Sequence, residues 1–197
     1  MRSNLVKLLT AMFALVCISV GMTAAQAPAG GPAVPPLIMT TTAWEDGGVI
    51  PDKYTQKASP MAPSPALNWS QVPPGTQSFV LLVHDPEPVL NKGSKMDITH
   101  WLIWNIPGNS AGLKEGVAQG ELSDGSRQVS LRLNGYMGPG APPGPYHHYT
   151  FELFAVDTKI DVPQGTPQEA ANTRTAVMNA IDGHVLGKAL LIARFHR

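Results

Sequence analysis

The sequence contains a single cysteine, Cys17, among its 197 residues. Without a second thiol the chain cannot close an intramolecular disulfide, so its stability must come from burial of apolar side chains and from backbone hydrogen bonds. One domain of this length can achieve that, because it buries about 70% of the surface that the unfolded chain exposes.

Charged residues are scarce, and neither sign is in excess. The chain has 14 basic and 14 acidic residues, and charged residues make up only 14% of it. Binding to nucleic acid or to another polyanion through bulk electrostatics needs an excess of basic residues. We therefore expect no nucleic-acid partner.

The apolar run near the N-terminus, Leu8–Val20, is shorter than the about 20 residues that a transmembrane helix needs. Arg2 and Lys7 precede this run, and the small residues Thr23-Ala24-Ala25 follow it. This order is typical of a cleaved secretory signal peptide, with an uncleaved N-terminal anchor as the alternative. We interpret residues 1–25 as the signal peptide and expect a periplasmic or secreted protein. Cleavage would remove the cysteine and two basic residues, which leaves a slight net negative charge.

After the predicted signal, residues 26–36 are mostly proline, glycine and alanine and indicate a flexible lead-in. From residue 37 onward, short apolar runs alternate with turn residues rich in glycine and proline. The runs predict strands at Leu37–Thr42, Ser78–Val83, Trp101–Ile106, Val129–Leu133, Tyr149–Val156 and Ala189–Phe195. This pattern favours a mostly β domain over residues 37–197, either a β-sandwich or a β-barrel.

One helix is predicted near the C-terminus. Thr166 can cap its first turn, Pro167 suits the first helical position, and Glu169 stands three residues after the cap, as in a capping box. Apolar residues then recur at helical spacing as far as Ile181, and Gly183 can end the helix.

Polar side chains with possible chemistry follow or begin the predicted strands. Asp85-Pro86-Glu87-Pro88 comes directly after the apolar run Ser78–Val83, and its prolines hold two carboxylates in a stiff loop. His100 stands beside Trp101 at the start of the next predicted strand. Either feature alone is also compatible with a solvated turn or with a packed, structural histidine.

Two further motifs lie close together between residues 135 and 149. The loop GYMGPGAPPGP, residues 135–145, has glycines that let backbone amides approach a ligand, although it is also compatible with a rigid surface connection. The loop leads into Tyr146–Tyr149 (YHHY) and an alternating strand. Because side chains alternate along a strand, His147 and Tyr149 share one face, while His148 points to the other.

Together these motifs resemble the signature regions of the phosphatidylethanolamine-binding family, in its bacterial, Raf-kinase-inhibitor-like branch. In that branch they are roughly DPDAP, HW, NIP, GYxGPxPP and HRYxF. The sequence has DPEP from Asp85, HW from His100, NIP from Asn105, and GYMGPGAPPGPYHHYTF from Gly135. The resemblance covers residues 37–197 and implies an antiparallel β-sandwich with a C-terminal helix.

The resemblance also implies a pocket that accepts phosphate-like and carboxylate anions. Its ligand-binding residues would be Asp85, Glu87, His100, Gly138, Pro139, His147 and Tyr149. Three departures from the family pattern are present. Glu87 replaces an aspartate, one extra residue separates Gly138-Pro139 from Pro142-Pro143, and His148 replaces an arginine. The extra residue leaves open which loop amide contacts the ligand.

A physical reason for anion binding beside two acids is that a carboxylate can orient or protonate an imidazole. In this hypothesis Asp85 holds either His100 or His147. That imidazole, the Tyr149 hydroxyl and loop amides are then the hydrogen-bond donors, and affinity for a phosphate monoester falls as the histidine loses its proton.

Other functions find weaker support in the sequence. An enzyme that uses an Asp/His acid–base pocket is the main alternative, but there is no GxSxG nucleophile motif and no cysteine outside the signal. Zinc binding by Asp85, His100 and His147 is possible chemically, but the close spacing of HExxH is absent, so we expect neither a metal nor a cofactor. The remaining histidines are assigned to structure or solvent: His84, His184 and His196.

The expected partners are a small anionic ligand, a lipid headgroup, or a protein such as a hydrolase or kinase-like enzyme that the chain inhibits or modulates. The resemblance to bacterial members of the family also favours a homodimer. The sequence pattern itself names none of these partners.

Overall fold

The computed structural model describes residues 35–58, 61–88, 92–93 and 97–197. The predicted signal peptide at 1–25 and all of the predicted lead-in except Pro35 and Pro36 lie outside these residues. Within the described part of the chain, no helix has both the length and the apolar character that a membrane crossing requires.

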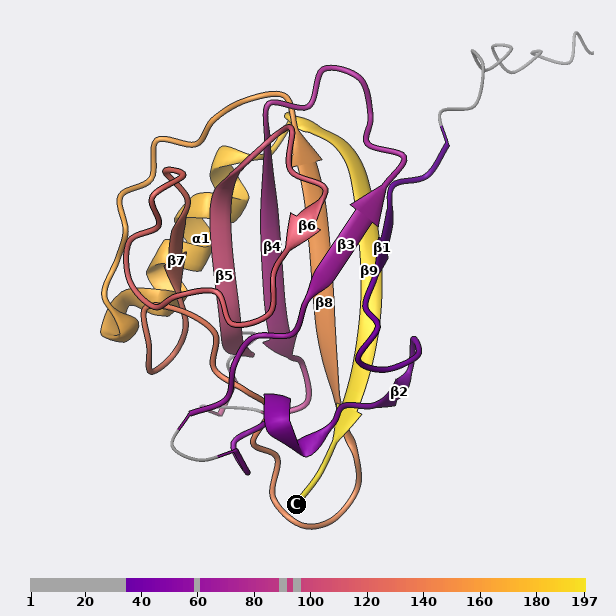
Figure 1. Ribbon diagram of the computed structural model, residues 1–197. Helices are drawn as coiled ribbons and strands as arrows, with labels where there is room; N and C mark the ends of the chain where they lie inside the picture. The colour runs from indigo at the N-terminus through magenta and orange to yellow at the C-terminus, as the bar shows by residue number, and fades with distance from the viewer. Residues whose placement is uncertain (1–34, 59–60, 89–91, 94–96) are drawn as a thin grey trace, which may run out of the picture. The chain divides into compact units, whose positions relative to one another are not determined.

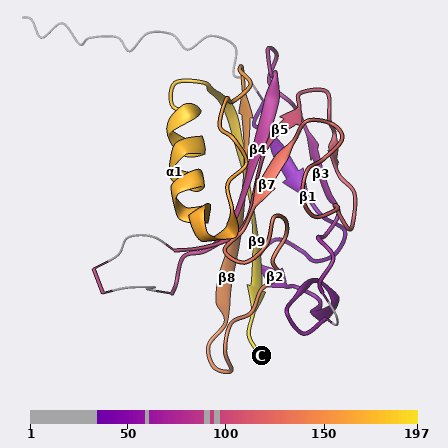
Figure 2. The same ribbon diagram turned by 90° about the vertical axis from the view of Figure 1, so that its left-hand side faces the viewer.

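The domain is a β-sandwich with one helix against its outer face (Figures 1 and 2). A three-stranded sheet has the order β1 (Ile38–Thr40), β3 (Leu67–Ser70) and β6 (Gly112–Leu113). The larger sheet has six strands, in the order β2 (Gly48–Val49), β9 (Val185–Phe195), β8 (His147–Val156), β4 (Ser78–Asp85), β5 (Ile98–Pro107) and β7 (Arg127–Val129). Neighbouring strands are antiparallel, except that β2 runs parallel to β9. The predicted mostly β sandwich with a C-terminal helix is confirmed.

Strand β4 is buried along its whole length because both of its faces are covered. Phe79, Leu81 and Val83 point between the two sheets, into the main hydrophobic core. Val80 and Leu82 point to the opposite face, where they join a second core beneath the helix. The unbroken apolar run in the sequence therefore reflects a central strand with a core on each side.

The C-terminal helix starts with a 3₁₀ turn, Pro167–Glu169, and continues as α1, Ala170–Ala180. The backbone N–H of Thr166 donates to the Glu169 carboxylate at 3.1 Å, as the capping-box pattern predicts. Val177 packs on the second core, and α1 runs along the outer face of the larger sheet (Figure 2). Gly183 has φ +80°, a conformation that suits glycine just beyond a helix.

The predicted strand Val129–Leu133 is wrong in most of its length, because β7 ends at Val129. The N–H of Ser130 donates to the Leu133 carbonyl at 2.7 Å, and its hydroxyl donates to the same carbonyl at 3.0 Å. These bonds close a turn that breaks the strand. Strands β2, β3 and β6 were not predicted, because they have two to four residues each and show no period.

Candidate functional site

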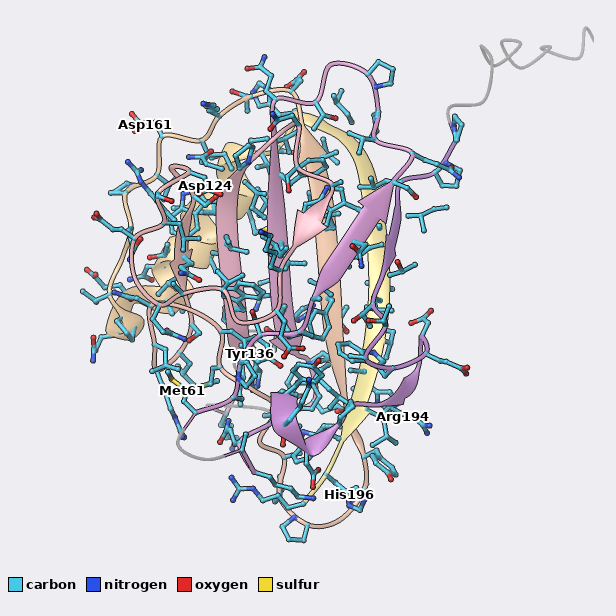
Figure 3. The ribbon with its side chains drawn as sticks, viewed as in Figure 1. Met61, Asp124, Tyr136, Asp161, Arg194 and His196 are labelled. Carbon is cyan, nitrogen blue, oxygen red and sulfur yellow. The ribbon has the colours of Figure 1, made fainter. Side chains whose placement is uncertain are left out.

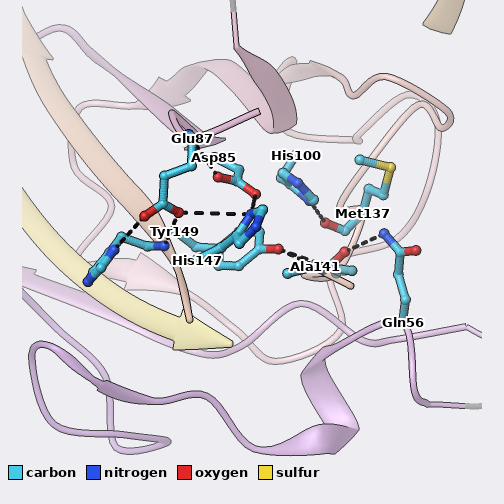
Figure 4. Close-up of polar contacts among 11 residues, drawn as sticks. Gln56, Asp85, Glu87, His100, Met137, Ala141, His147 and Tyr149 are labelled. Carbon is cyan, nitrogen blue, oxygen red and sulfur yellow. Dashed lines mark hydrogen bonds and ion pairs between the residues drawn. The ribbon is translucent and has the colours of Figure 1, made fainter. Parts of the chain in front are cut away.

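A cavity of about 320 Å³ lies where β4 ends and β5 and β8 begin. Four of the predicted ligand-binding residues line it: Asp85, His100, His147 and Tyr149 (Figure 4). The other lining residues are Gln56, Pro88, Ile98, Leu131, Arg132, Met137, Gly140, Ala141 and Pro142. The structure thus brings together groups that are up to 93 positions apart in the chain.

Asp85 pairs with His147, and not with His100. Asp85 is the last residue of β4 and only 2% exposed. Its Oδ2 lies 2.7 Å from Nδ1 of His147, and its Oδ1 accepts the backbone N–H of Glu87 at 3.1 Å. Because a carboxylate only accepts hydrogen bonds, Nδ1 of His147 carries a hydrogen. The Asp85 carboxylate therefore sets both the ring orientation and the tautomer of His147.

Tyr149 lies two residues beyond His147 on the same face of β8, and its ring is buried. Its hydroxyl oxygen accepts two backbone N–H groups of the glycine-proline loop, from Gly140 at 3.2 Å and from Ala141 at 3.0 Å (Figure 4). These two amides are thus already engaged and do not face a ligand as free donors. Burial and the nearby Asp85 carboxylate raise the pKa of Tyr149, so its hydroxyl keeps a hydrogen that it can donate.

His100 reaches the cavity through a β-bulge in β5. Val83 of β4 is opposite Trp101, whereas the next residue, His84, is opposite Thr99. His100 is therefore an extra residue in the ladder, and the bulge allows it to line the cavity although its neighbour Trp101 belongs to the core on the same side of the sheet.

The surroundings of His100 favour a neutral ring. Its Nδ1 donates to the Met137 carbonyl at 2.9 Å, and its ring meets the Tyr149 ring edge to face with centroids 5.0 Å apart. Burial lowers the pKa of His100, which outweighs the hydrogen bond to Met137. A neutral imidazole with a hydrogen on Nδ1 has a lone pair on Nε2. His100 is therefore suited to accept a hydrogen bond from a ligand, which corrects the expectation that it could be a charged donor.

Two long polar side chains on the cavity lining were missed by the sequence analysis. Arg132 is the permanent cation on the cavity lining, and no carboxylate within 4.0 Å pairs with it among the described residues. A basic residue three positions before the glycine-proline loop is a weak signal that could have identified it. Gln56 comes from a distant segment. Its Nε2 donates to the Gly138 carbonyl at 2.9 Å, and no local pattern predicts that contact.

The other three predicted residues lie beside the cavity and do not line it. Glu87 accepts the backbone N–H of His148 at 2.7 Å and lies 2.8 Å from Nδ1 of the same residue. Burial disfavours its charge, but these bonds prevail and hold the pKa of Glu87 below its usual value. The Pro139 carbonyl accepts the N–H of Gln56 at 2.8 Å. A Cβ on Gly138 would lie 2.7 Å from the Tyr54 carbonyl oxygen, so glycine permits the close packing there.

Among the described residues, three side chains at or beside the cavity bring donor atoms of the kind that metals bind close together. Asp85, Glu87 and His147 each offer one such atom, and these atoms lie within 4.8 Å of one another. In the observed arrangement the Nδ1 hydrogen of His147 bonds to Asp85. A cation bound there through Nδ1 would have to displace that hydrogen.

A separate ionic cluster occupies the helix-facing side of the larger sheet. Nδ1 of His84 lies 2.7 Å from Asp97, and Nε2 lies 3.1 Å from Glu152. Arg174 of α1 donates to Asp97, and Lys188 of β9 pairs with Glu152 at 2.5 Å. The cluster ties the helix to three strand segments, which fits the structural role expected for His84.

Comparisons with known proteins agree with this architecture. The profile of the family described as phosphatidylethanolamine-binding protein matches residues 40–196. A UPF0098 protein of Methanothermobacter thermautotrophicus is 40% identical over 162 residues, which are 81% of this chain and 98% of that protein.

Two solved structures have the same fold. A phosphatidylethanolamine-binding protein homologue of Chlamydia trachomatis is 26% identical with a TM-score of 0.66, and the match covers 82% of this chain and 98% of that one. Escherichia coli YbcL matches with a TM-score of 0.65 at 23% identity, over 82% of this chain and 98% of that one. The chain therefore belongs to the phosphatidylethanolamine-binding protein family.

Proposed function

We propose that the protein is exported and binds small anions that carry a phosphate or carboxylate group, with His147, Tyr149 and Arg132 as donors. The observation that carries this proposal is the Asp85–His147 pair, which lines one cavity together with Tyr149 and Arg132. Export is supported by the signal-like pattern of residues 1–25.

The charges in the cavity explain how an anion can bind beside Asp85. When His147 is protonated, its charge offsets that of Asp85, and Arg132 then leaves the cavity with a net positive charge. His147 would use Nε2 for the ligand, since Nδ1 is bonded to Asp85. His100 would accept a hydrogen bond from a hydroxyl or a protonated oxygen of the same ligand. Hydrogen bonds to a charged group contribute roughly 1.5–3 kcal/mol each.

Calorimetric titration with methyl phosphate at about pH 6, within the histidine titration range, tests this function. The parent protein should bind, and Arg132→Gln should weaken binding about tenfold, from loss of about 1.5 kcal/mol. Lys114→Gln is the matched control, since it removes a cation from the β3–β6 region. No binding by the parent protein would overturn the proposal. Equal affinity of Arg132→Gln and the parent protein would show that Arg132 does not bind the anion.

A low-activity hydrolase is the second candidate, because a carboxylate that orients an imidazole is also the geometry of a general base. None of the described residues that line the cavity is serine, threonine or cysteine, so a nucleophile from water is the simplest proposal. Hydrolysis of p-nitrophenyl phosphate and p-nitrophenyl acetate discriminates between the candidates. True activity must fall in both Asp85→Asn and His147→Gln, whereas residual activity shared by all variants indicates a contaminant.

A protein partner would be recognised by the same chemistry in this proposal. A hydrolase or kinase-like enzyme that inserts a phosphorylated or acidic side chain into the cavity would be inhibited, because that side chain would be held in the cavity. Because the protein is proposed to be exported, such a partner would lie outside the cytoplasm. Competition by methyl phosphate would be expected for any partner that uses this cavity.

A further inference from the structure

A second cavity, of about 270 Å³, adjoins the first. The two cavities share three lining residues, Gln56, Arg132 and Met137. The rest of the second cavity is lined by residues with little polarity: Ala58, Met61, Ala62, Leu133, Tyr136 and Gly138. Figure 3 labels two of them, Met61 and Tyr136, near the same end of the domain.

We propose that the second cavity holds an apolar substituent of the ligand, so that the protein prefers an anion with an alkyl chain over the bare anion. The ligand class is then a phosphate monoester, or a similar anion, of an apolar alcohol. This inference rests on the proposed function, because the anionic group must occupy the first cavity.

An apolar group can contact the walls of the second cavity without depriving a buried polar atom of its hydrogen-bond partner. Tyr136 is only 1% exposed, and its hydroxyl donates to the Tyr54 carbonyl at 2.8 Å. Because this polar atom already has its partner, the ring can pack against an apolar group. Ala62 is buried, and Met61 is about half exposed. Among the lining residues Arg132 alone carries charge, so no carboxylate in this cavity repels an anionic ligand.

Hydrogen bonds and close packing hold the residues at the boundary between the two cavities in place. The side-chain amide of Gln56 bonds to the Gly138 carbonyl, and its backbone N–H bonds to the Pro139 carbonyl. A Cβ on Gly140 would lie 2.3 Å from that amide, so Gln56 packs tightly on the loop. The Met137 carbonyl fixes His100 at the same place. The residues at the boundary between the cavities are therefore preorganised.

Arg132 sets the direction of the ligand. Because it lines both cavities, its guanidinium can bind an anion at their boundary, while its aliphatic stem contacts an apolar chain. A phosphate held there by Arg132, His147 and Tyr149 would direct its ester substituent away from the polar side chains of the first cavity. The second cavity is the apolar space on the other side of Arg132.

Calorimetry with methyl, propyl and hexyl phosphate tests the inference on the full exported protein. Each methylene that enters the cavity should increase affinity about fourfold, with a plateau once the chain outgrows the cavity. Met61→Gln and Ala62→Leu should reduce this gain and leave methyl phosphate binding unchanged. Leu190→Gln is the control, since Leu190 is 51% exposed on β9 and lines neither cavity. Met61→Gln changes an exposed side chain, so it retains the fold even if Ala62→Leu does not.

The outcomes separate the two proposals. Equal affinity for methyl and hexyl phosphate overturns the inference and leaves the proposed function intact, whereas binding of neither ester overturns the function. A chain-length gain that persists in both cavity variants places the chain elsewhere and also overturns the inference. Sedimentation with phosphatidylcholine vesicles, with and without phosphatidic acid, distinguishes a bilayer lipid from a soluble ester as the source. Association with vesicles in the absence of affinity for hexyl phosphate counts against the inference.

Discussion

Nδ1 of His147 lies 2.7 Å from Oδ2 of Asp85, although 62 positions separate the two residues in the chain. They meet because β4 and β8 are antiparallel neighbours, with His84 opposite Thr150. The end of β4 therefore lies beside the start of β8. The pair is largely enclosed, since the Asp85 side chain is 2% exposed and that of His147 is 21% exposed. An ion pair or hydrogen bond in such a place is screened less by salt than one on the surface.

The pH dependence of binding follows from this pair. His147 donates from Nε2 only when it carries a second hydrogen, so affinity measured over a range of about pH 5.5 to 8 should be highest at the acidic end. Methyl sulfate is the preferred probe, because its charge does not change in this range, whereas a phosphate monoester gains charge near pH 6. Calorimetry across this range should show the fall in the parent protein and not in His147→Gln. Constant affinity in the parent protein would contradict the role of His147.

Tyr149→Phe should destabilise the protein and weaken anion binding together. The substitution leaves the N–H groups of Gly140 and Ala141 without their acceptor, and an unsatisfied buried donor costs about 1–3 kcal/mol. Urea unfolding should show this loss, and the two amides should exchange hydrogen faster. Tyr146→Phe is the matched control, because Tyr146 is 39% exposed. An unchanged unfolding free energy in Tyr149→Phe would show that the loop is held in another way.

The stability of the protein should fall above neutral pH because of His84. Burial opposes its charge, but the hydrogen bonds to Asp97 and Glu152 prevail and raise the pKa of His84 above 6.5. Both ring nitrogens face carboxylates, so the doubly protonated ring satisfies both. Its contribution is complete below the unfolded pKa of about 6.5 and is lost as the pH rises through the higher folded pKa.

Urea unfolding between about pH 6 and 9, which spans the His84 titration, measures this effect. The unfolding free energy of the parent protein should decline across the range, and His84→Gln should be less stable at pH 6 with a smaller decline. His184→Gln is the control, because His184 pairs with Asp157 at an exposed position. Parallel curves for the parent protein and His84→Gln would refute the assignment.

Export predicts a defined mature N-terminus. If residues 1–25 are a cleaved signal, protein recovered from the periplasm or medium of a bacterial host should begin at Gln26. Intact-mass measurement gives this directly. Ala25→Arg should block processing, because signal peptidase requires a small residue before the cleavage site. Recovery of exported protein that still carries Met1 would exclude cleavage.

Local sequence patterns determined a large part of this molecule. Residues 149–156 were predicted as an alternating strand, and Tyr149, Phe151 and Leu153, at every second position of it, all lie in the main core. The same period placed His147 and Tyr149 on the cavity side and left His148 to pair with Glu87. The helix start at Thr166 and Pro167 was also predictable. Such features depend on strand or helix period and on capping, which act over a few residues.

Tertiary structure decided which of these groups meet. The bulge that turns His100 toward the cavity is a shift in register between β4 and β5, and no period in the sequence of either strand reveals it. Arg132 and Gln56 line the cavity because distant segments pack there, and the amides of Gly140 and Ala141 bond to Tyr149. The choice of His147 over His100 as the partner of Asp85 has the same origin. Contacts between residues far apart in sequence depend on strand pairing and packing, which a local pattern does not encode.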